Sequence, residues 1–233
     1  MPSIKASKNA TPHLPEDYDT KISSVIPYYT SIHQETINLV KSLPSCPKIW
    51  MDTGCGTGSL ICKAIAQFPD TKFLMLDPSE GMLEQAKEKL VSCSHERLEF
   101  LKASPTQEFF QELEERPNII TAIQCHHYLD RENRAKAVKM CYELLKDDGL
   151  FISFENIRPF TEEGISVGKR YWGEYQASHG RSYEEIETHL ERFGTEYFPI
   201  TIEDHLKLLR NSGFRTVELF WYSYMQAGFY GIK

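Results

Sequence analysis

Paired cysteines are missing from this sequence. Its six cysteines are scattered along the chain, and no two of them form a C-x-x-C pair. Scattered single cysteines favour neither a zinc site nor a disulfide framework. We therefore expect reduced thiols and no bound metal.

Long apolar runs are missing as well. No stretch approaches the ~20 apolar residues that span a bilayer, and residues 1–5 do not start an apolar run of the secretory kind. The sequence predicts a cytoplasmic protein that contacts no membrane.

An excess of positive charge is also absent. The chain has 26 basic and 33 acidic side chains, a net charge of −7, which disfavours a nucleic-acid partner. It contains no internal repeat and no low-complexity tract. With 233 residues, 41% hydrophobic and 25% charged, it has the composition of a globular protein with one hydrophobic core. We expect one domain over residues 1–233.

The N-terminal part, residues 1–44, predicts an arm followed by a helical cap. Residues 1–20 are polar and contain three prolines, which is typical of a loosely ordered arm. Residues 21–43 carry apolar residues at helical spacing, interrupted at Pro27, which disfavours helix in the residue before it. The sequence therefore predicts two helical pieces joined at a Pro-Tyr-Tyr corner.

Strand and helix patterns alternate from residue 45 onward. Apolar strands are predicted at 48–52, 72–77, 97–101, 118–123 and 150–155, and helices at 59–67, from Ser79, and at 134–146. Such alternation predicts an α/β fold, a Rossmann-like, mostly parallel sheet with helices on both faces.

The C-terminal part departs from this rhythm. Residues 156–200 predict a helical insertion or lid before the sixth strand, and residues 201–213 predict a capped helix. Residues 216–222 and 227–232 are too close together for a helical crossover and predict an antiparallel hairpin. The sheet then has seven strands. Residues 45–155 are the predicted cofactor-binding core, and residues 201–233 hold the last helix and the hairpin.

A glycine-rich loop follows the first predicted strand. Gly54, Gly56 and Gly58 occupy alternate positions after Asp52, so that a ligand can approach the backbone closely. A dinucleotide loop has the spacing G-x-G-x-x-G and leaves the helix N-terminus clear for a pyrophosphate. The acid before this loop would repel phosphate but suits the ammonium group of adenosylmethionine.

Asp77 ends the second predicted strand, 19 residues after Gly58. An acid at this place can accept hydrogen bonds from both hydroxyls of a ribose. Together with the loop, it predicts a nucleoside site.

Over residues 45–155 the chain resembles the class I S-adenosylmethionine-dependent methyltransferases, and the hairpin at 216–232 also matches their sheet. The resemblance implies S-adenosylmethionine as cofactor, S-adenosylhomocysteine as product, and no metal. In that family an aspartate often follows the third strand and binds the adenine; here Ser104 stands there. The cofactor contacts implied are Asp52, Gly54, Cys55, Gly56, Gly58, Asp77, Pro78, Met82 and Ser104.

The chain is also similar to the branch that contains carboxy-S-adenosylmethionine synthase, through residues 26–29 and 218–222. The resemblance implies that Tyr29 and Gln124 contact the cofactor. The branch binds its extra carboxylate with an arginine, whose ungapped position falls on Leu190; Arg192 replaces it only with an alignment shift.

His126 and His127 follow the fourth predicted strand, at the sheet edge where ligands of open α/β sheets bind. A histidine there can act as a general base. Neighbouring residues of an extended chain point in opposite directions, so at most one of the two faces the site. The alternative role for both is packing or hydrogen bonding.

Aromatic residues gather in the predicted insertion. Tyr171, Trp172 and Tyr175 share nearly one helical face, and with Tyr28 and Tyr222 they are the predicted substrate-binding residues. Ordinary core packing explains the same pattern. The basic residues between 131 and 139 are interpreted as a solvated helix face.

The preferred function is methyl transfer from S-adenosylmethionine to a small-molecule oxygen, nitrogen or sulfur atom by in-line displacement. One alternative is a carboxy-S-adenosylmethionine synthase acting in tRNA wobble-uridine modification. The other is a non-catalytic nucleoside-binding module on the same fold. The sequence allows a homodimer without requiring one.

Overall fold

A single twisted sheet of seven strands organises the protein. The computed structural model describes residues 15–91, 93 and 95–233, and the strand order is β3-β2-β1-β4-β5-β7-β6. The five parallel strands are β1 (Ile49–Thr53), β2 (Lys72–Leu76), β3 (Leu98–Phe100), β4 (Ile119–Ile123) and β5 (Leu150–Asn156). The predicted mostly parallel, Rossmann-like sheet is confirmed.

The predicted C-terminal hairpin closes the sheet. Strand β7 (Gln226–Ile232) runs antiparallel to β5, pairing Leu150 with Ile232, and β6 (Thr216–Ser223) pairs antiparallel with β7. Strands β1, β4 and β5 are entirely or almost entirely buried, as expected for parallel strands covered on both faces.

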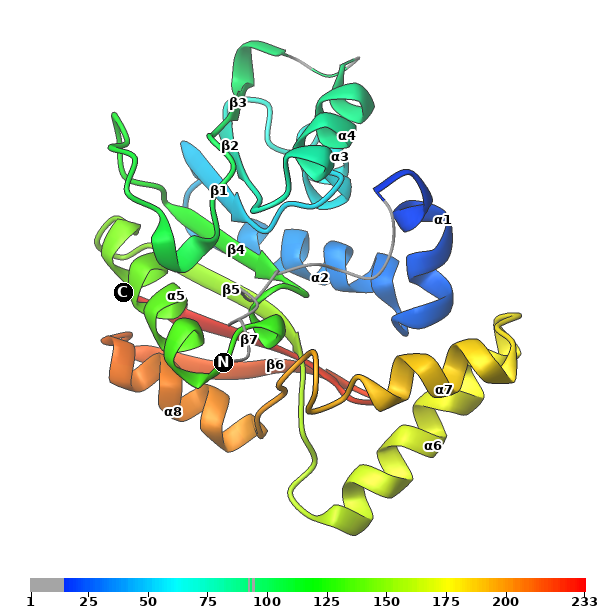
Figure 1. Ribbon diagram of the computed structural model, residues 1–233. Helices are drawn as coiled ribbons and strands as arrows, with labels where there is room; N and C mark the ends of the chain where they lie inside the picture. The colour runs from blue at the N-terminus through cyan, green and yellow to red at the C-terminus, as the bar shows by residue number, and fades with distance from the viewer. Residues whose placement is uncertain (1–14, 92, 94) are drawn as a thin grey trace, which may run out of the picture.

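Helices cover both faces of the sheet (Figure 1). One core forms beneath α2 (Tyr29–Lys41), α3 (Ser59–Ala64) and α4 (Glu80–Leu90), and the other beneath α5 (Arg131–Leu144) and α8 (Ile202–Ser212). Side chains fix several ends: Ser79 caps α4 by accepting the amide of Met82, and Gly213 ends α8 in a left-handed conformation with φ 113°.

The order of the strands reverses between β1 and β4. In open α/β sheets, ligands bind at this point, beyond the carboxyl ends of the strands. The connection from β3 to β4 contains only a short 3-10 turn, η2 (Thr106–Glu108), rather than an α-helix. The carboxyl edge of the sheet is therefore framed by loops.

The N-terminal segment is more helical than the sequence predicts. Helix α1 spans Pro15–Val25 and is separated from α2 by a corner at which Tyr28 has φ 58°. The two helical pieces are confirmed, but the expectation of an irregular arm is wrong for residues 15–20, because that stretch forms the first turns of α1. Residues 1–14 of the predicted arm lie outside the described residues.

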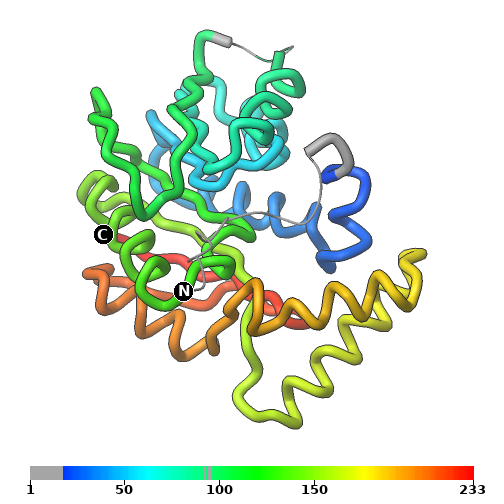
Figure 2. Tube along the Cα trace, in the orientation of Figure 1, coloured from blue at the N-terminus to red at the C-terminus, as the bar shows by residue number. Residues whose placement is uncertain are grey.

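The predicted insertion is helical. It consists of α6 (Glu162–Ser178) and α7 (Tyr183–Glu191), and α7 begins with a capping box between Ser182 and Glu185. Figure 2 shows the two helices folded back on each other at one end of the molecule, below α1 in this view. Among the described helices, none combines the length and apolar character needed to cross a bilayer.

Candidate functional site

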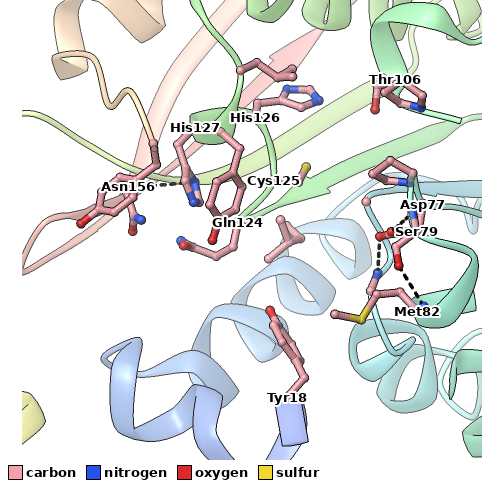
Figure 3. A pocket seen from close by; sticks show the side chains of 18 of the residues that line it. Tyr18, Asp77, Ser79, Met82, Thr106, Gln124, Cys125, His126, His127 and Asn156 are labelled. Atoms are coloured by element: carbon pink, nitrogen blue, oxygen red, sulfur yellow. Dashed lines mark hydrogen bonds between the residues drawn. The ribbon is translucent and has the colours of Figure 1, made fainter. Parts of the chain in front are cut away.

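A cavity of about 340 Å³ lies at the carboxyl edge of the sheet. Its floor comes from the loops after β1, β2, β3 and β4 and from the end of β5, while α1 and residues of the 189–197 segment form its walls. Figure 3 shows Asp77 on one side of this cavity and His127 on the other. The two ends have different chemistry.

The glycine loop forms part of the first end. Gly56 has φ 53°, and a Cβ built on it meets no atom within 4 Å, so the backbone borders open space in the cavity. Gly58, with φ 75°, serves packing instead, because its Cβ would lie 3.0 Å from the side chain of Leu90. Gly54 and Gly56 line the cavity, whereas Gly58 lets α3 pack closely on α4.

Asp77 lies beside this loop at the end of β2. Its Oδ2 accepts the amide of Gly56 at 2.9 Å and its Oδ1 accepts the amide of Ser79 at 2.8 Å. Burial raises the pKa of the carboxyl, and the two amides act against this shift. Each carboxylate oxygen keeps a further lone pair, so the group can receive two hydroxyls of a ribose.

Asp52 does not reach the cavity. It is buried at the end of β1, and its Oδ1 accepts the hydroxyl of Thr121 at 2.6 Å. Burial raises the pKa of Asp52 to about 7, with the charge of Asp77 adding to the effect. It ties β1 to β4 beneath the loop and is not a cavity contact.

His127 lies at the opposite end, within a 3-10 turn, η3 (His126–Tyr128). Its Nδ1 is 2.8 Å from Oε2 of Glu155, and the side chains of this pair are 2% and 1% exposed. Glu155 also accepts the backbone amides of His126 and His127, at 3.1 and 2.9 Å. No group of the described chain hydrogen-bonds Nε2 of His127.

Glu155 is ionised despite its burial. Burial on its own would raise its pKa, but the hydrogen bond from His127 and the nearby imidazoles outweigh this and lower the pKa. A carboxylate at 2.8 Å requires a proton on Nδ1 of His127. In the neutral ring the lone pair is then on Nε2, and the amide of Asn156, 3.4 Å from Nδ1, is too far away to compete with the carboxylate.

His126 has a different environment. Its ring stacks on Phe151 with centroids 6.3 Å apart, and its Nε2 is enclosed with no hydrogen-bond partner in the described chain. Burial lowers the pKa of His126 to about 4, so the ring is neutral. Both histidines border the cavity, because η3 is helical; the extended chain assumed from the sequence is wrong.

Arg134 fixes the backbone of the turn that carries the two histidines. Its guanidinium donates to the carbonyls of His126 at 3.0 Å, Leu129 at 2.9 Å, His127 at 3.4 Å and Phe198. The residue is 2% exposed, so its interpretation as part of a solvated face is wrong. It joins η3 to the 193–200 segment.

Gln124 stands between the two ends. It has φ 56°, which is rare for a residue with a side chain, and its amide donates to the carbonyl of Phe154 at 2.6 Å. The side chain is buried and lines the cavity, yet neither its Oε1 nor its Nε2 has a partner in the described chain. Unpaired buried amide groups are costly, and a bound ligand would satisfy them.

The outer wall includes Arg192 and Tyr197. The Nε of Arg192 donates to Oε2 of Glu196 at 2.6 Å, and its guanidinium lies 5.8 Å from the centroid of the Tyr197 ring. His189 adds a hydrogen bond between its Nδ1 and Nε2 of Gln176 at 3.1 Å. This wall brings a positive charge to the cavity.

The structure gathers eight of the predicted site residues around the cavity. These are Gly54, Gly56, Asp77, Pro78, Met82, Gln124, His126 and His127. Five predicted cofactor contacts lie behind it: Tyr29, Asp52, Cys55, Gly58 and Ser104.

Neighbouring residues line the cavity in place of Tyr29 and Ser104. Tyr29 packs edge-on against Tyr18, with centroids 6.5 Å apart, and Tyr18 rather than Tyr29 borders the cavity. The hydroxyl of Ser104 donates to the carbonyl of Pro105, and Pro105 and Thr106 border the cavity in its place.

None of the five predicted substrate-binding aromatics lines the cavity. Trp172 is fully buried and donates from Nε1 to the carbonyl of Val25 at 2.6 Å. Tyr171 stacks on Tyr224 at the surface, with centroids 4.0 Å apart, and Tyr28 and Tyr222 are 51% and 61% exposed. Tyr175 donates to the carbonyl of Ser23 at 2.8 Å. The three aromatics of α6 therefore make packing and hydrogen-bonding contacts, the alternative that the sequence left open for them, whereas Tyr28 and Tyr222 are largely exposed.

Sequence reasoning missed the side chains that helix α1 and the insertion add. They are Tyr18, Ile22 and Val25 of α1, Ile26 directly after it, and His189 and Tyr197 of the 189–197 segment. Arg192, which the sequence offers only through an alignment shift, lies with them. Helical periodicity could have placed Ile22, Val25 and Ile26 on one face of a helix. Glu155 had a usable signal, since it is an acid near the end of a largely apolar strand, β5, which pairs with the strand that precedes the His-His pair.

A family model described as "Methyltransferase domain" matches residues 51–151, the stretch that holds the glycine loop, Asp77 and η3. Among curated proteins, carboxy-S-adenosyl-L-methionine synthase of Nautilia profundicola is 22% identical, over 87% of this chain and 84% of that protein. The protein of the same name from Wolinella succinogenes is 28% identical, over 86% and 83%.

Solved methyltransferase structures share this fold. A candidate O-methyltransferase of Nostoc punctiforme superposes with a TM-score of 0.71 at 16% identity, over 99% of this chain; the chain spans only 64% of that protein. Magnesium protoporphyrin IX methyltransferase of Synechocystis, with bound S-adenosylhomocysteine, gives a TM-score of 0.64 at 15% identity, over 91% of this chain and 86% of that one.

Proposed function

Since the chain is a class I S-adenosylmethionine-dependent methyltransferase, we propose that it transfers the methyl group to a small-molecule oxygen, nitrogen or sulfur atom. One observation carries the proposal: a single cavity joins a ribose-binding acid, Asp77, to a histidine paired with a buried carboxylate, His127. The first suits a nucleoside donor, and the second suits an acceptor that must lose a proton.

The residues around Asp77 fit the cofactor. The carboxylate receives the ribose hydroxyls, the open backbone at Gly56 leaves room for the amino-acid part, and the unpaired amide of Gln124 offers both a donor and an acceptor. When bound there, S-adenosylmethionine supplies an electrophilic methyl group on a sulfonium. Nucleophile, methyl carbon and sulfur must then be collinear.

His127 serves as the general base. Glu155 fixes the proton on Nδ1 and stabilises the imidazolium that forms when Nε2 accepts a proton from the acceptor. Arg134 holds the carbonyls of η3, so the ring keeps its position. No covalent enzyme intermediate is needed.

Apolar side chains keep this reaction dry. Ile22, Val25 and Ile26 of α1 border the cavity on one side and Leu129 on another. A water-excluding pocket strengthens the interaction between Glu155 and the charged imidazole. A small acceptor fits such a space.

Titration calorimetry with S-adenosylhomocysteine tests the proposed cofactor site at Asp77. Asp77→Asn keeps the shape of the side chain but removes its charge, and Asp77→Ala removes both; we expect weaker binding in both variants and the larger loss in Asp77→Ala. Wild-type affinity in both variants would refute the site assignment.

A turnover assay tests the proposed methyl transfer to a small-molecule acceptor. Wild-type protein is incubated with S-adenosylmethionine and a panel of phenols, thiols, amines and carboxylates, and S-adenosylhomocysteine is measured. Production that depends on one acceptor supports the proposal. Cofactor binding without turnover on any of them would favour the non-catalytic module.

A second candidate function is carboxy-S-adenosylmethionine synthesis. The specific observation in its favour is Arg192, whose buried guanidinium borders the cavity that contains Asp77, so it could hold an extra carboxylate on the donor. The curated relatives named above support it as well.

Mass spectrometry of the ligand carried through purification separates the two candidates. A ligand heavier than S-adenosylmethionine by the mass of one carbon dioxide, and lost in Arg192→Gln, supports the second. Ordinary S-adenosylmethionine or S-adenosylhomocysteine supports the first.

A further inference from the structure

A second hollow, of about 1040 Å³, lies between α5 and α8, on the sheet face opposite α2 and α3. Six arginines and lysines line it, against three acids, in a chain whose net charge is −7. Lys136 and Lys139 pair with Glu132 and Glu143 of the same border, and Arg134 is buried against carbonyls, so the exposed excess of positive charge comes mainly from Arg131, Arg158 and Lys207. The basic residues are Arg131, Arg134, Lys136, Lys139, Arg158 and Lys207. We refer to this hollow as the α5–α8 groove.

The floor of the α5–α8 groove is apolar. Met140 from α5, Leu208 from α8, and Phe198 and Ile200 from the connecting segment line it, and Phe198 is 38% exposed. A groove with an apolar floor and a basic border fits a segment that has an apolar side chain flanked by acids.

The chain itself carries such a segment. In the loop between η2 and β4, Phe110 is 85% exposed and is followed by Glu112, Glu114 and Glu115, which are all exposed. A single exposed apolar residue is common, but here it coincides with three like charges within six residues. We refer to residues 109–116 as the acidic loop.

The acidic loop is fixed beside the groove at both ends. At its start, η2 packs against α5, and Gln107 borders the groove. At its end, Arg116 donates to the carbonyls of Glu143 and Leu145 at the C-terminal end of α5, and the carbonyl of Pro117 accepts the amide of Lys146 at 2.9 Å. Helix α5 therefore carries the groove on one side and the loop on another.

We propose that the α5–α8 groove binds the acidic loop of a second copy of this chain. Phe110 of each copy lies on the apolar floor of the other, and the loop glutamates face the basic border. Because loop and groove are joined to the same helix, one two-fold axis can place both loops in both grooves, which gives a closed dimer.

Two other occupants fit the groove less well. Residues 1–14 contain two lysines and no acid, so the N-terminal segment has the wrong charge. A nucleic acid would meet three acids in the border, Glu132, Glu143 and Asp204, and has no use for the apolar floor.

A charge exchange between loop and groove tests the dimer. The loop variant carries Glu112→Lys, Glu114→Lys and Glu115→Lys, and the groove variant carries Arg131→Glu, Lys136→Glu and Lys207→Glu. Each variant alone faces like charges at both contacts of its homodimer. In the mixed dimer, both contacts again join opposite charges, one of them reversed and the other native.

Sedimentation velocity over a range of concentrations provides the readout. We expect wild-type dimers, a dimer dissociation constant raised about tenfold or more in each variant alone, and recovery of the dimer on mixing. Phe110→Ser should weaken the dimer as well, through the apolar contact. High salt should weaken the wild-type dimer.

A control variant carries Glu84→Lys, Glu88→Lys and Glu174→Lys. It makes the same change of charge as the loop variant, but on α4 and α6, away from the loop and groove, and should stay dimeric. Circular dichroism and binding of S-adenosylhomocysteine show that each variant is folded. A wild-type monomer at high concentration would overturn the proposal and leave the groove to another protein. Variants that stay dimeric, or a mixture that does not recover, would overturn it too.

Discussion

Glu155 carries three hydrogen bonds on one buried carboxylate. Two come from the amides of η3 and one comes from Nδ1 of His127. The backbone contacts position the turn, whereas the imidazole contact sets the tautomer of the candidate base. Substitution of this one side chain therefore separates catalysis from cofactor binding.

Glu155→Gln should lower kcat by roughly 10²-fold, within the range that general-base catalysis contributes. The neutral amide stabilises the imidazolium less than a carboxylate does, while Asp77 and the glycine loop are untouched. Affinity for S-adenosylhomocysteine should stay close to wild type by calorimetry. His127→Asn is the companion variant, and an unchanged kcat in both would exclude the proposed base.

Asp52 makes stability depend on pH. Its folded pKa of about 7 exceeds the ~3.9 of an unfolded aspartate, so the folded state holds a proton that the unfolded state releases. This contribution is present at low pH and is lost as the pH rises toward 7. The shift follows mainly from burial.

Asp52→Asn removes the titrating group and keeps an oxygen for the hydroxyl of Thr121. The free energy of unfolding of the variant, relative to wild type, should increase as the pH is raised from about 4 to about 7 and then level off. Urea unfolding at several pH values measures the difference. A constant difference over this range would contradict the raised pKa.

Helix α1 connects the cofactor end of the cavity to the insertion. Asp19 accepts the hydroxyls of Thr57 and Ser59 at 2.8 and 3.0 Å and pairs with Lys89 of α4. At the other end of α1, the carbonyls of Ser23 and Val25 are bound by α6. Since α1 borders the cavity, we expect its attachments to influence the release of a bound ligand.

Asp19→Asn should weaken the contacts of α1 with Thr57, Ser59 and Lys89. The pair with Lys89 is partly exposed, so its removal should change the rate of ligand release only modestly, by about two- to fivefold. We expect faster release of S-adenosylhomocysteine in stopped-flow displacement, with kcat reduced less than in Glu155→Gln. Asp70→Asn, on the exposed turn before β2, is the control; equal release rates in wild type and Asp19→Asn would contradict this role of α1.

The sequence predicts the elements better than the contacts between distant ones. Short runs rich in apolar residues and capping residues locate β1, α4 and the hairpin because their signals are local. The first turns of α1 and the burial of Arg134 are not predictable in this way, since both depend on partners from other parts of the chain. Tertiary contacts override local polarity at these places.

The same distinction holds for the site. The Asp77 end depends on one loop and one strand end, which are close in sequence, and its residues are predicted. The outer wall is built by α1 and the 189–197 segment, whose approach to the sheet no local pattern specifies. The aromatics of α6 follow a pattern that serves packing as well as binding, and here packing uses them.

At the scale of the whole molecule, three buried histidines decide the response to acid. Burial is the main cause that lowers the pKa of His33 to about 3, of His126 to about 4 and of His205 to about 3. All three are neutral in the folded protein at neutral pH. They lie in α2, η3 and α8, so both faces of the sheet are affected.

The protein should lose stability as the pH falls below about 6.5, the pKa of an unfolded histidine. The unfolded chain then binds protons that the folded state refuses, and the loss continues toward the folded pKa values. Asp52 and Asp77, whose carboxyl pKa values are raised by burial, act in the opposite direction but are outnumbered by the three imidazoles, so the net effect in wild type is destabilisation. Asp52→Asn should respond to acid more steeply. His33→Gln, which removes one buried imidazole, should respond less steeply. Urea midpoints between pH 7 and 5 measure these slopes, and an unchanged midpoint in wild type would show that the histidines do not titrate on unfolding.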